Sequence, residues 1–232
     1  ELISEFVCVF ELSNAPLFRV EIVKYSEIEF LLLLDMHHII ADGMSTDIFL
    51  HELSELYNGE ELPVLRIQYK DYSEWFNQRN FAQDQLYWKK VLQGDIPVLN
   101  MQYDYQRPQV QGFSGRVLNM KIGSKIKSQV KQLAKQTNTT DYMIFLSCVM
   151  LMLGTYCRQN DIIVGSPVSG RLNSDTDSLI GMLVNTIPLR CQYNKCDSYK
   201  AFLEKVKNIC LNAYEHQEYP LERMIQDLGI RR

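Results

Sequence analysis

The sequence predicts an α/β protein built from two segments. Its 232 residues are 46% hydrophobic, which is enough apolar material for a sizeable core. Along the chain the apolar residues alternate between the period of a strand and that of a helix. The pattern restarts after a stretch punctuated by glycine and proline between Gly94 and Gly115. We therefore expect one segment at residues 1–97, a linker at 98–115 and a second segment at 116–232.

The first segment begins with two strands. Residues 18–25 alternate between apolar and polar side chains, and residues 29–38 are almost continuously apolar, which is typical of a strand covered on both faces. From Ser45 onward apolar side chains recur every three or four residues, so a helix follows. Asn58 and Gly59 end this helix. Two further helices are predicted, at 68–76 and 85–94.

The second segment uses the same two patterns. Apolar alternation predicts strands, and apolar residues three and four apart predict helices. Both kinds of element alternate as far as the end of the chain. The predicted strands are 115–122, 161–170 and 185–193, and the predicted helices are 124–137, 140–156 and 199–217.

Charge and composition exclude several functions. Lys and Arg total 24 against 28 Asp and Glu, so the formal net charge is −4, and no basic block suited to nucleic acid occurs. The longest apolar runs fall short of the roughly 20 residues that span a bilayer. Six cysteines without a CxxC pair indicate reduced thiols in a cytoplasmic protein. We expect neither a nucleic acid nor a membrane as a partner.

The stretch LLLLDMHHIIADGMS, residues 31–45, carries the candidate chemistry. Side chains on a strand alternate between faces, so His37 and His38 point opposite ways and do not ligate one metal ion together. Asp42 can cap the following helix or pair with an arginine, and Gly43 permits a φ angle that a side chain would resist. Such a turn can position His38 as a general base. A buried histidine that is satisfied by the backbone remains the alternative.

The heptapeptide HHIIADG, residues 37–43, resembles the HHxxxDG signature of condensation domains of nonribosomal peptide synthetases. These domains belong to the chloramphenicol acetyltransferase-like superfamily. Four further stretches resemble segments of the same family in the same order, and the resemblance extends over essentially the whole chain. They are YKDYSEW (69–75), DIIVGSPVSGR (161–171), IGMLVNTIPLR (180–190) and HQEYPLERM (216–224).

The resemblance implies a fold and an activity. Condensation domains have two lobes, each a sheet with flanking helices, and this chain would hold incomplete parts of both. An upstream and a downstream peptidyl carrier domain bring the substrates on 4′-phosphopantetheine arms, beside an adenylation domain, and an amide bond forms between them. The domain itself binds no cofactor. The resemblance makes His38 catalytic, gives His37, Asp42 and Gly43 as the rest of the motif, and makes Arg171, Asn185 and Arg190 candidates for lining a tunnel.

Two expectations qualify this assignment. The arginine that usually pairs with the motif aspartate of the family would lie before Glu1. We therefore expect Asp42 to lack its partner in this chain, which costs stability, and the segment alone to be inactive. Three other functions also remain open, namely an epimerization domain, an acyltransferase that uses coenzyme A, and a docking domain without catalysis.

Overall fold

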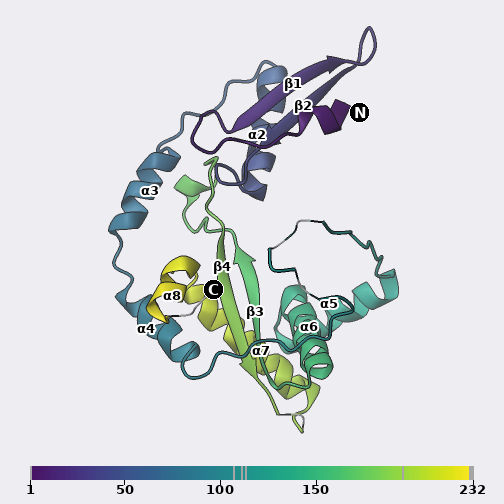
Figure 1. The fold of residues 1–232 in the computed structure, drawn as a ribbon, viewed down its shortest axis with the longest axis vertical. Coiled ribbons are helices and arrows are strands. Elements are labelled where there is room, and N and C mark those ends of the chain that lie inside the picture. Colours follow the sequence, from purple (N-terminus) through teal and green to yellow (C-terminus); the bar gives the residue numbers. More distant parts are fainter. Residues whose placement is uncertain (1, 107, 111, 113, 195, 230–232) are drawn as a thin grey trace. The chain divides into compact units, whose positions relative to one another are not determined.

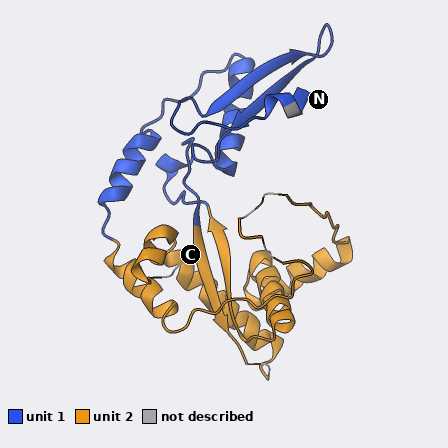
Figure 2. Cartoon of the chain, in the orientation of Figure 1, with its two compact units in different colours: residues 1–80, 169–185 blue, residues 81–168, 186–232 orange. Residues whose placement is uncertain are grey.

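The computed structural model describes residues 2–106, 108–110, 112, 114–194 and 196–229. The protein combines helices and strands, as predicted (Figure 1). It divides into two compact units (Figure 2). Unit 1 comprises Glu1–Asn80 and Ser169–Asn185, and unit 2 comprises Phe81–Val168 and Thr186–Arg232. A short piece from the second half of the chain is therefore built into unit 1.

Unit 1 is organised around an antiparallel hairpin. Strand β1 (Phe18–Lys24) pairs with β2 (Phe30–Met36) in a register that places Phe18 opposite Met36. The predicted strands at 18–25 and 29–38 are thus confirmed, with β2 ending before both histidines. The other elements of this unit are α1 (Leu2–Phe6), α2 (Gly43–Tyr57), α3 (Tyr69–Gln78) and the short 3₁₀ helix η1 (Ser174–Thr176).

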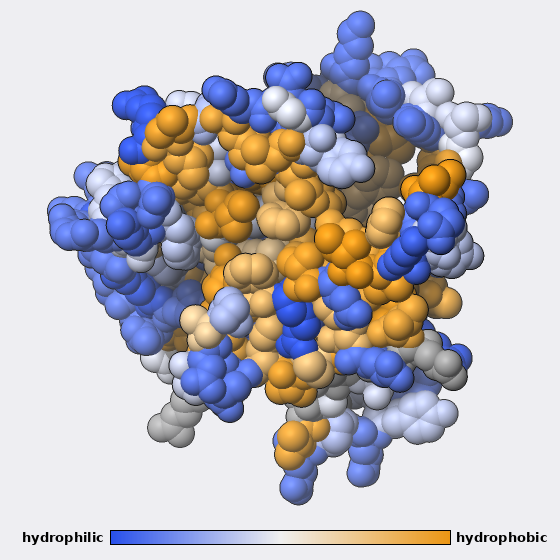
Figure 3. Space-filling view, turned by 90° about the horizontal axis from the view of Figure 1, so that it is seen from above, coloured by the Kyte–Doolittle hydropathy of each residue, from blue (hydrophilic) through white to orange (hydrophobic). Residues whose placement is uncertain are grey.

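One face of the hairpin is open. Phe30 and Leu31 of β2 are 63% and 46% exposed, so the expectation that this strand is covered on both faces is wrong for the described residues. The reason is that the sheet of unit 1 has two strands, and with α2 it lines an apolar groove of about 910 Å³. Apolar side chains gather over much of the face shown in Figure 3.

In its described residues, unit 2 contains two paired strands and five helices. Strand β3 (Asp161–Val168) pairs with β4 (Asn185–Gln192). The helices are α4 (Ala82–Val91), α5 (Ser124–Thr137), α6 (Asp141–Cys157), α7 (Tyr199–Glu215) and α8 (Leu221–Asp227). Helix α6 packs against α5, α7 and β3, and α4 packs against α8.

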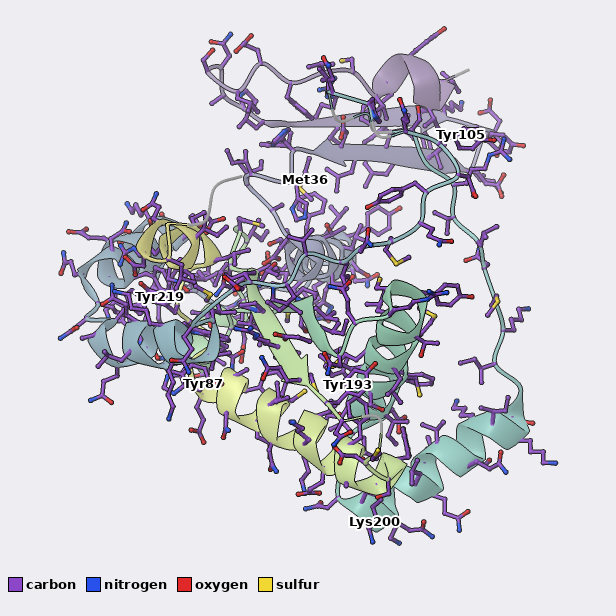
Figure 4. All side chains as sticks on the ribbon, turned by 60° about the horizontal axis from the view of Figure 1, so that its bottom comes forward. Met36, Tyr87, Tyr105, Tyr193, Lys200 and Tyr219 are labelled. Carbon is purple, nitrogen blue, oxygen red and sulfur yellow. The ribbon has the colours of Figure 1, made fainter. Side chains whose placement is uncertain are left out.

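The core of unit 2 lies between α6, the strands and α7. Met150, Ile187 and Leu203 come from these elements and are fully buried. Tyr193, labelled in Figure 4, follows β4 and packs edge-on against Phe202 of α7, with ring centroids 5.3 Å apart. Burial of apolar area at about 25 cal/mol per Å² is the main stabilising contribution in such a core.

Arg190 of β4 ties the end of α4 to the strands. Its Nη2 donates to the Asp161 carboxylate at 2.7 Å, its Nε donates to the same carboxylate at 3.0 Å, and its Nη1 donates to the carbonyl of Gln93 at 2.8 Å. Burial acts to raise the pKa of Asp161, but the hydrogen bonds from Arg190 and Gln192 outweigh it and hold that pKa below its usual value. The planar fork of an arginine is needed to reach all these acceptors together.

One predicted strand is absent. Residues 115–122 form no strand, and their apolar members Val117 and Leu118 are 85% and 91% exposed. Alternation alone does not make a strand, because the backbone also needs a partner, and β3 and β4 pair with each other. The predicted helices 124–137, 140–156 and 199–217 are confirmed to within two residues at each end.

The compact units differ from the predicted segments. The chain divides at Asn80 rather than at residue 97, because α4 packs within unit 2. The predicted linker also begins inside unit 2, where the Gln159 side chain donates to the carbonyl of Val98 at 3.0 Å and accepts the N–H of Asn100 at 2.9 Å. The return of residues 169–185 to unit 1 was not predicted.

The cysteines form no disulfide. All six are free, and Cys157, Cys191 and Cys210 are buried. Burial raises the pKa of Cys191 and of Cys210 to about 11, so both stay protonated near neutral pH. They are packing residues rather than nucleophiles.

In the described part of the chain no single helix is long and apolar enough to cross a membrane. Helices α5 and α6 reach the necessary length and composition only as a pair, and the chain bends by 101° between them.

Replacing Arg190 by lysine tests the tie between α4 and the strands. An ammonium group cannot make the forked contact, so we expect Arg190→Lys to lower the free energy of unfolding by about 1–3 kcal/mol. Urea denaturation measures this loss. Arg66→Lys is the matched control, because Arg66 pairs with Asp175 while 80% exposed and should change stability by less than about 0.5 kcal/mol. Equal losses in the two variants would contradict the role given to Arg190.

Candidate active site

The two histidines lie in the turn that follows β2. The N–H of His37 still bonds to the carbonyl of Leu17 at 2.9 Å, which extends the hairpin by one residue. The His37 ring accepts the N–H of Ile39 on Nδ1 at 3.1 Å and packs edge-on against Phe10 at 6.0 Å between centroids. These contacts make His37 a structural member of the turn.

His38 is held differently and is exposed. Its Nδ1 lies 2.7 Å from the carbonyl oxygen of Ala41. A carbonyl oxygen can only accept, so Nδ1 carries the proton in this hydrogen bond. In the neutral ring Nε2 then has the free lone pair. The turn therefore presents a histidine with a defined tautomer whose Nε2 can accept a proton.

Asp42 closes the turn and begins α2. It is the N-cap of that helix, and its Oδ1 accepts the N–H of Ser45 at 2.8 Å. The hydroxyl of Ser45 donates to the same oxygen at 2.7 Å, and both side chains are buried. A capping aspartate satisfies backbone donors that the first helical turn leaves free. The start of α2 is thus fixed immediately after Ala41, the residue that holds His38.

Arg171 is the charged partner of Asp42. Its Nη1 donates to Oδ2 at 2.7 Å and its Nη2 to Oδ1 at 3.1 Å, and the two side chains are 1% and 0% exposed. The expectation that Asp42 lacks an arginine partner in this chain is wrong. The pair joins residues 129 positions apart, which local sequence patterns do not reveal. A buried arginine cannot line an open tunnel either, so Arg171 is a structural partner of the motif.

Hydrogen bonds set the charge state of Asp42. Burial raises the pKa of the carboxyl group, but the bonds from Arg171, from Ser45 and from the N–H of Leu183 outweigh it and lower the pKa to about 2. The group is therefore ionised throughout the physiological range. Among the described residues the Nε of Arg171 has no hydrogen-bond partner.

The segment 169–185 is shaped to reach this pair. Gly170 has a φ angle of +68°, and a Cβ there would lie 1.9 Å from the carbonyl oxygen of Leu183. Only glycine combines that backbone conformation with such a close approach. The segment folds back on itself, and Arg171 and Leu183 meet at the Asp42 carboxylate.

Gly43 does not have the role we expected. It is the first residue of α2, its φ angle lies outside the left-handed region, and a Cβ added to it would meet nothing within 4 Å. The expected conformational reason for glycine is therefore wrong. In this structure Gly43 is exposed, and its missing side chain leaves open space next to the first turn of the helix.

Arg190 and Asn185 are the remaining tunnel candidates. Arg190 bonds to Asp161 inside unit 2, and Asn185 is the half-buried first residue of β4. Their role as lining residues stays a prediction. Ser45 belongs to the site but was not predicted. The signal was present, because an N-cap aspartate followed three residues later by serine is a capping-box pattern.

The described residues offer little to a metal ion. No group of three or more His, Cys, Asp or Glu side chains among them is placed to hold one. The apolar groove between the hairpin and α2 contains neither His38 nor Asp42. The candidate site is therefore the turn itself rather than this groove.

The lowered pKa of Asp42 makes stability depend on pH in a defined direction. The folded pKa of about 2 lies below the ordinary value of 3.8, so the ionised group stabilises the fold above about pH 4 and this stabilisation is lost as the pH falls toward 2. The shift corresponds to about 2 kcal/mol. Urea denaturation across this range should show the stability advantage of the wild type over Asp42→Asn shrinking below about pH 4. Parallel curves for the two proteins would contradict the assignment.

This chain is similar to known proteins along its whole length. The model of the condensation domain family matches residues 1–232. Surfactin synthase subunit 1 of Bacillus subtilis (strain 168) is 42% identical over 234 residues, and tyrocidine synthase 3 of Brevibacillus parabrevis is 41% identical over 236 residues. Both alignments cover 100% of this chain but only 6% and 4% of the relatives, so the chain spans a small part of their length.

Solved structures show the same fold. A four-domain nonribosomal peptide synthetase bound to AMP and glycine matches 96% of this chain with a TM-score of 0.88 and 23% identity, over 17% of its own length. The X-domain from teicoplanin biosynthesis matches 97% of this chain with a TM-score of 0.88 and 19% identity, over 53% of its length. The first condensation domain of the calcium-dependent antibiotic synthetase, with a substrate analogue, matches 92% with a TM-score of 0.71 and 20% identity, over 51% of its length. With its intact HHxxxDG turn and the match of the family model along its whole length, this chain belongs to the condensation domain family.

Proposed function

We propose that this domain forms an amide bond between a donor acyl or peptidyl thioester and the amine of an aminoacyl acceptor, both carried by partner domains. The observation that supports this most is the exposed His38, whose Nδ1 is bound to the carbonyl of Ala41 so that Nε2 keeps a free lone pair. Membership of the condensation domain family gives the class of reaction. Peptide synthesis by a longer protein that contains this domain is part of the same proposal.

The reaction needs one proton acceptor. The amine nitrogen attacks the thioester carbonyl, a C–N bond forms, and the nitrogen must lose a proton. Nε2 of His38 takes that proton as the tetrahedral intermediate forms. The C–S bond then breaks, and the departing sulfur receives the proton from the imidazolium. Atoms and charge balance without a metal or a further reactant.

Orientation contributes beside proton transfer. An α-amino group has an ordinary pKa of about 7.7–8.0, so part of the acceptor amine is already unprotonated near neutral pH. Holding that amine against the carbonyl can contribute as much to the rate as removal of its proton. We therefore assign His38 two tasks, namely to orient the amine through Nε2 and to accept its proton.

The substrates reach the domain on partners. We infer that upstream and downstream carrier domains deliver them on 4′-phosphopantetheine arms, which belong to the substrates and not to this chain. An adenylation domain would load the acceptor. The support for this is that this chain covers only 6% and 4% of two related synthases and that one matching structure is a four-domain nonribosomal peptide synthetase.

A docking domain without catalysis is the second candidate. The observation in its favour is that the fold also matches the X-domain solved in complex with OxyB, so the fold alone does not select catalysis. Against it stands the complete HHxxxDG turn, with its buried Asp42 and its exposed His38. Carrier binding without any product that depends on His38 would favour the docking role.

Two enzymatic alternatives can be separated by substrate. An epimerization domain would exchange the α-proton of a single loaded carrier, which uptake of deuterium from the solvent detects. An acyltransferase that uses coenzyme A would react with free acyl-CoA in the absence of a carrier. Product formed only when two loaded carriers are present supports the proposed amide synthesis.

Substitution of His38 tests the two assigned tasks. General-base catalysis is typically worth about 10²–10⁴ in rate, so we expect His38→Ala to lower kcat by about 10²-fold or more. His38→Gln keeps a hydrogen-bond acceptor and should retain more activity than the alanine variant. Product formation from loaded carriers measures both rates.

The control for this series is another histidine on the same unit. His51 of α2 pairs with Glu55 while its side chain is 73% exposed, so His51→Ala should leave kcat unchanged. If His38→Gln fell as low as His38→Ala, proton transfer would outweigh orientation. Wild-type activity in all three variants would contradict the assignment of the site.

A further inference from the structure

Three consecutive residues of the segment 169–185 are each held by a different residue of the first part of unit 1. The N–H of Gly181 bonds to Ser45 Oγ at 3.0 Å, and the N–H of Leu183 bonds to Asp42 Oδ2 at 3.2 Å. Between them, the carbonyl of Met182 accepts the hydroxyl of Tyr69 at 2.9 Å. Ser45 and Asp42 belong to the motif turn described above. Tyr69 lies outside this turn, at the start of α3.

Tyr69 touches the segment in two ways. Its hydroxyl group binds Met182, and its ring lies so close to Gly181 that a Cβ added there would come within 2.1 Å of Cδ2. The ring therefore requires a glycine beneath it. The contact combines a hydrogen bond with a close steric fit. It therefore holds the segment against the start of α3.

The backbone that carries Tyr69 is held in place at the start of α3. Tyr69 is the first residue of α3, directly after the N-cap Gln68, whose backbone N–H bonds to the Asp71 carboxylate at 2.8 Å. Burial and the negative charge of Asp42 both raise the pKa of Tyr69, so its hydroxyl group stays protonated and remains a donor. A rigid helix start thus presents a permanent donor to the Met182 carbonyl.

We propose that Tyr69 is a positioning residue for amide formation, which holds residues 181–183 in the register that completes the contacts of Asp42 and Ser45. This rests on the proposed function. The effect reaches His38 through a short path, since Asp42 is covalently joined to Ala41, whose carbonyl holds the His38 ring. Loss of the Tyr69 contact lets Leu183 move away from Asp42 and loosens the turn that aims Nε2 at the substrate.

Tyr69→Phe tests the proposal in the full-length protein with donor and acceptor loaded on carrier domains. The variant keeps the ring over Gly181 and removes the single donor. We expect kcat to fall about threefold to tenfold, as for the loss of one hydrogen bond, while KM for the loaded acceptor stays unchanged. Hydrogen–deuterium exchange measured by mass spectrometry should become faster in the peptide that contains residues 181–183.

Two further variants sharpen the test. Tyr25→Phe is the matched control, because Tyr25 lies in the hairpin turn of the same unit and is 80% exposed, and both readouts should match the wild type. In Ser45→Ala combined with Tyr69→Phe, the fall in kcat should be smaller than the product of the two single effects, since both residues hold the same segment.

The exchange rates and the kinetic constants of Tyr69→Phe together distinguish a positioning role from a merely structural one. Faster exchange at 181–183 with a lower kcat and an unchanged KM supports the positioning role. Faster exchange with an unchanged kcat makes Tyr69 merely structural and overturns it, as does unchanged exchange. Should the wild type form no amide from loaded carriers, the proposed function fails, and the exchange rates alone then decide whether Tyr69 holds the segment.

Discussion

The buried ion pair between Asp42 and Arg171 is the contact on which the rest of the site depends. It joins the turn after β2 to a segment from the second half of the chain, and the same carboxylate caps α2. Removing one partner of such a pair typically costs about 3–5 kcal/mol, because a charge is left buried and uncompensated. The capped helix fixes the position of Ala41, and the carbonyl of Ala41 fixes the tautomer of His38. The Asp42 carboxylate therefore both stabilises the fold and fixes the turn that carries His38.

Local patterns predicted most elements because the information for each lies in neighbouring residues. The alternation in 18–25 and the apolar spacing after Ser45 gave β1 and α2, and Asn58 correctly marked the end of the helix. The HHxxxDG turn was also recognisable, since its residues fall within one heptapeptide. Recognising this motif requires no knowledge of tertiary contacts.

Tertiary contacts could not be predicted in the same way. Arg171 was expected to line a tunnel, yet it meets Asp42 only because residues 169–185 return to unit 1. The strand predicted at 115–122 failed for the opposite reason, because its alternating side chains found no partner strand. Tyr69 begins YKDYSEW, a segment that indicated the family, but its contact could not be predicted, since it depends on a carbonyl 113 residues away. Contacts between residues more than 100 positions apart produce no local sequence pattern from which they could be predicted.

A double-mutant cycle between Asp42 and Arg171 measures how strongly the buried pair holds the turn. The free energy of unfolding is measured for the wild type, Asp42→Asn, Arg171→Met and the combined variant. The two residues share a buried bidentate contact, so we expect a coupling of about 2 kcal/mol or more, with the double variant losing far less than the sum of the single losses. Losses that add to within about 0.5 kcal/mol would contradict this expectation, because the pair would then not hold the turn.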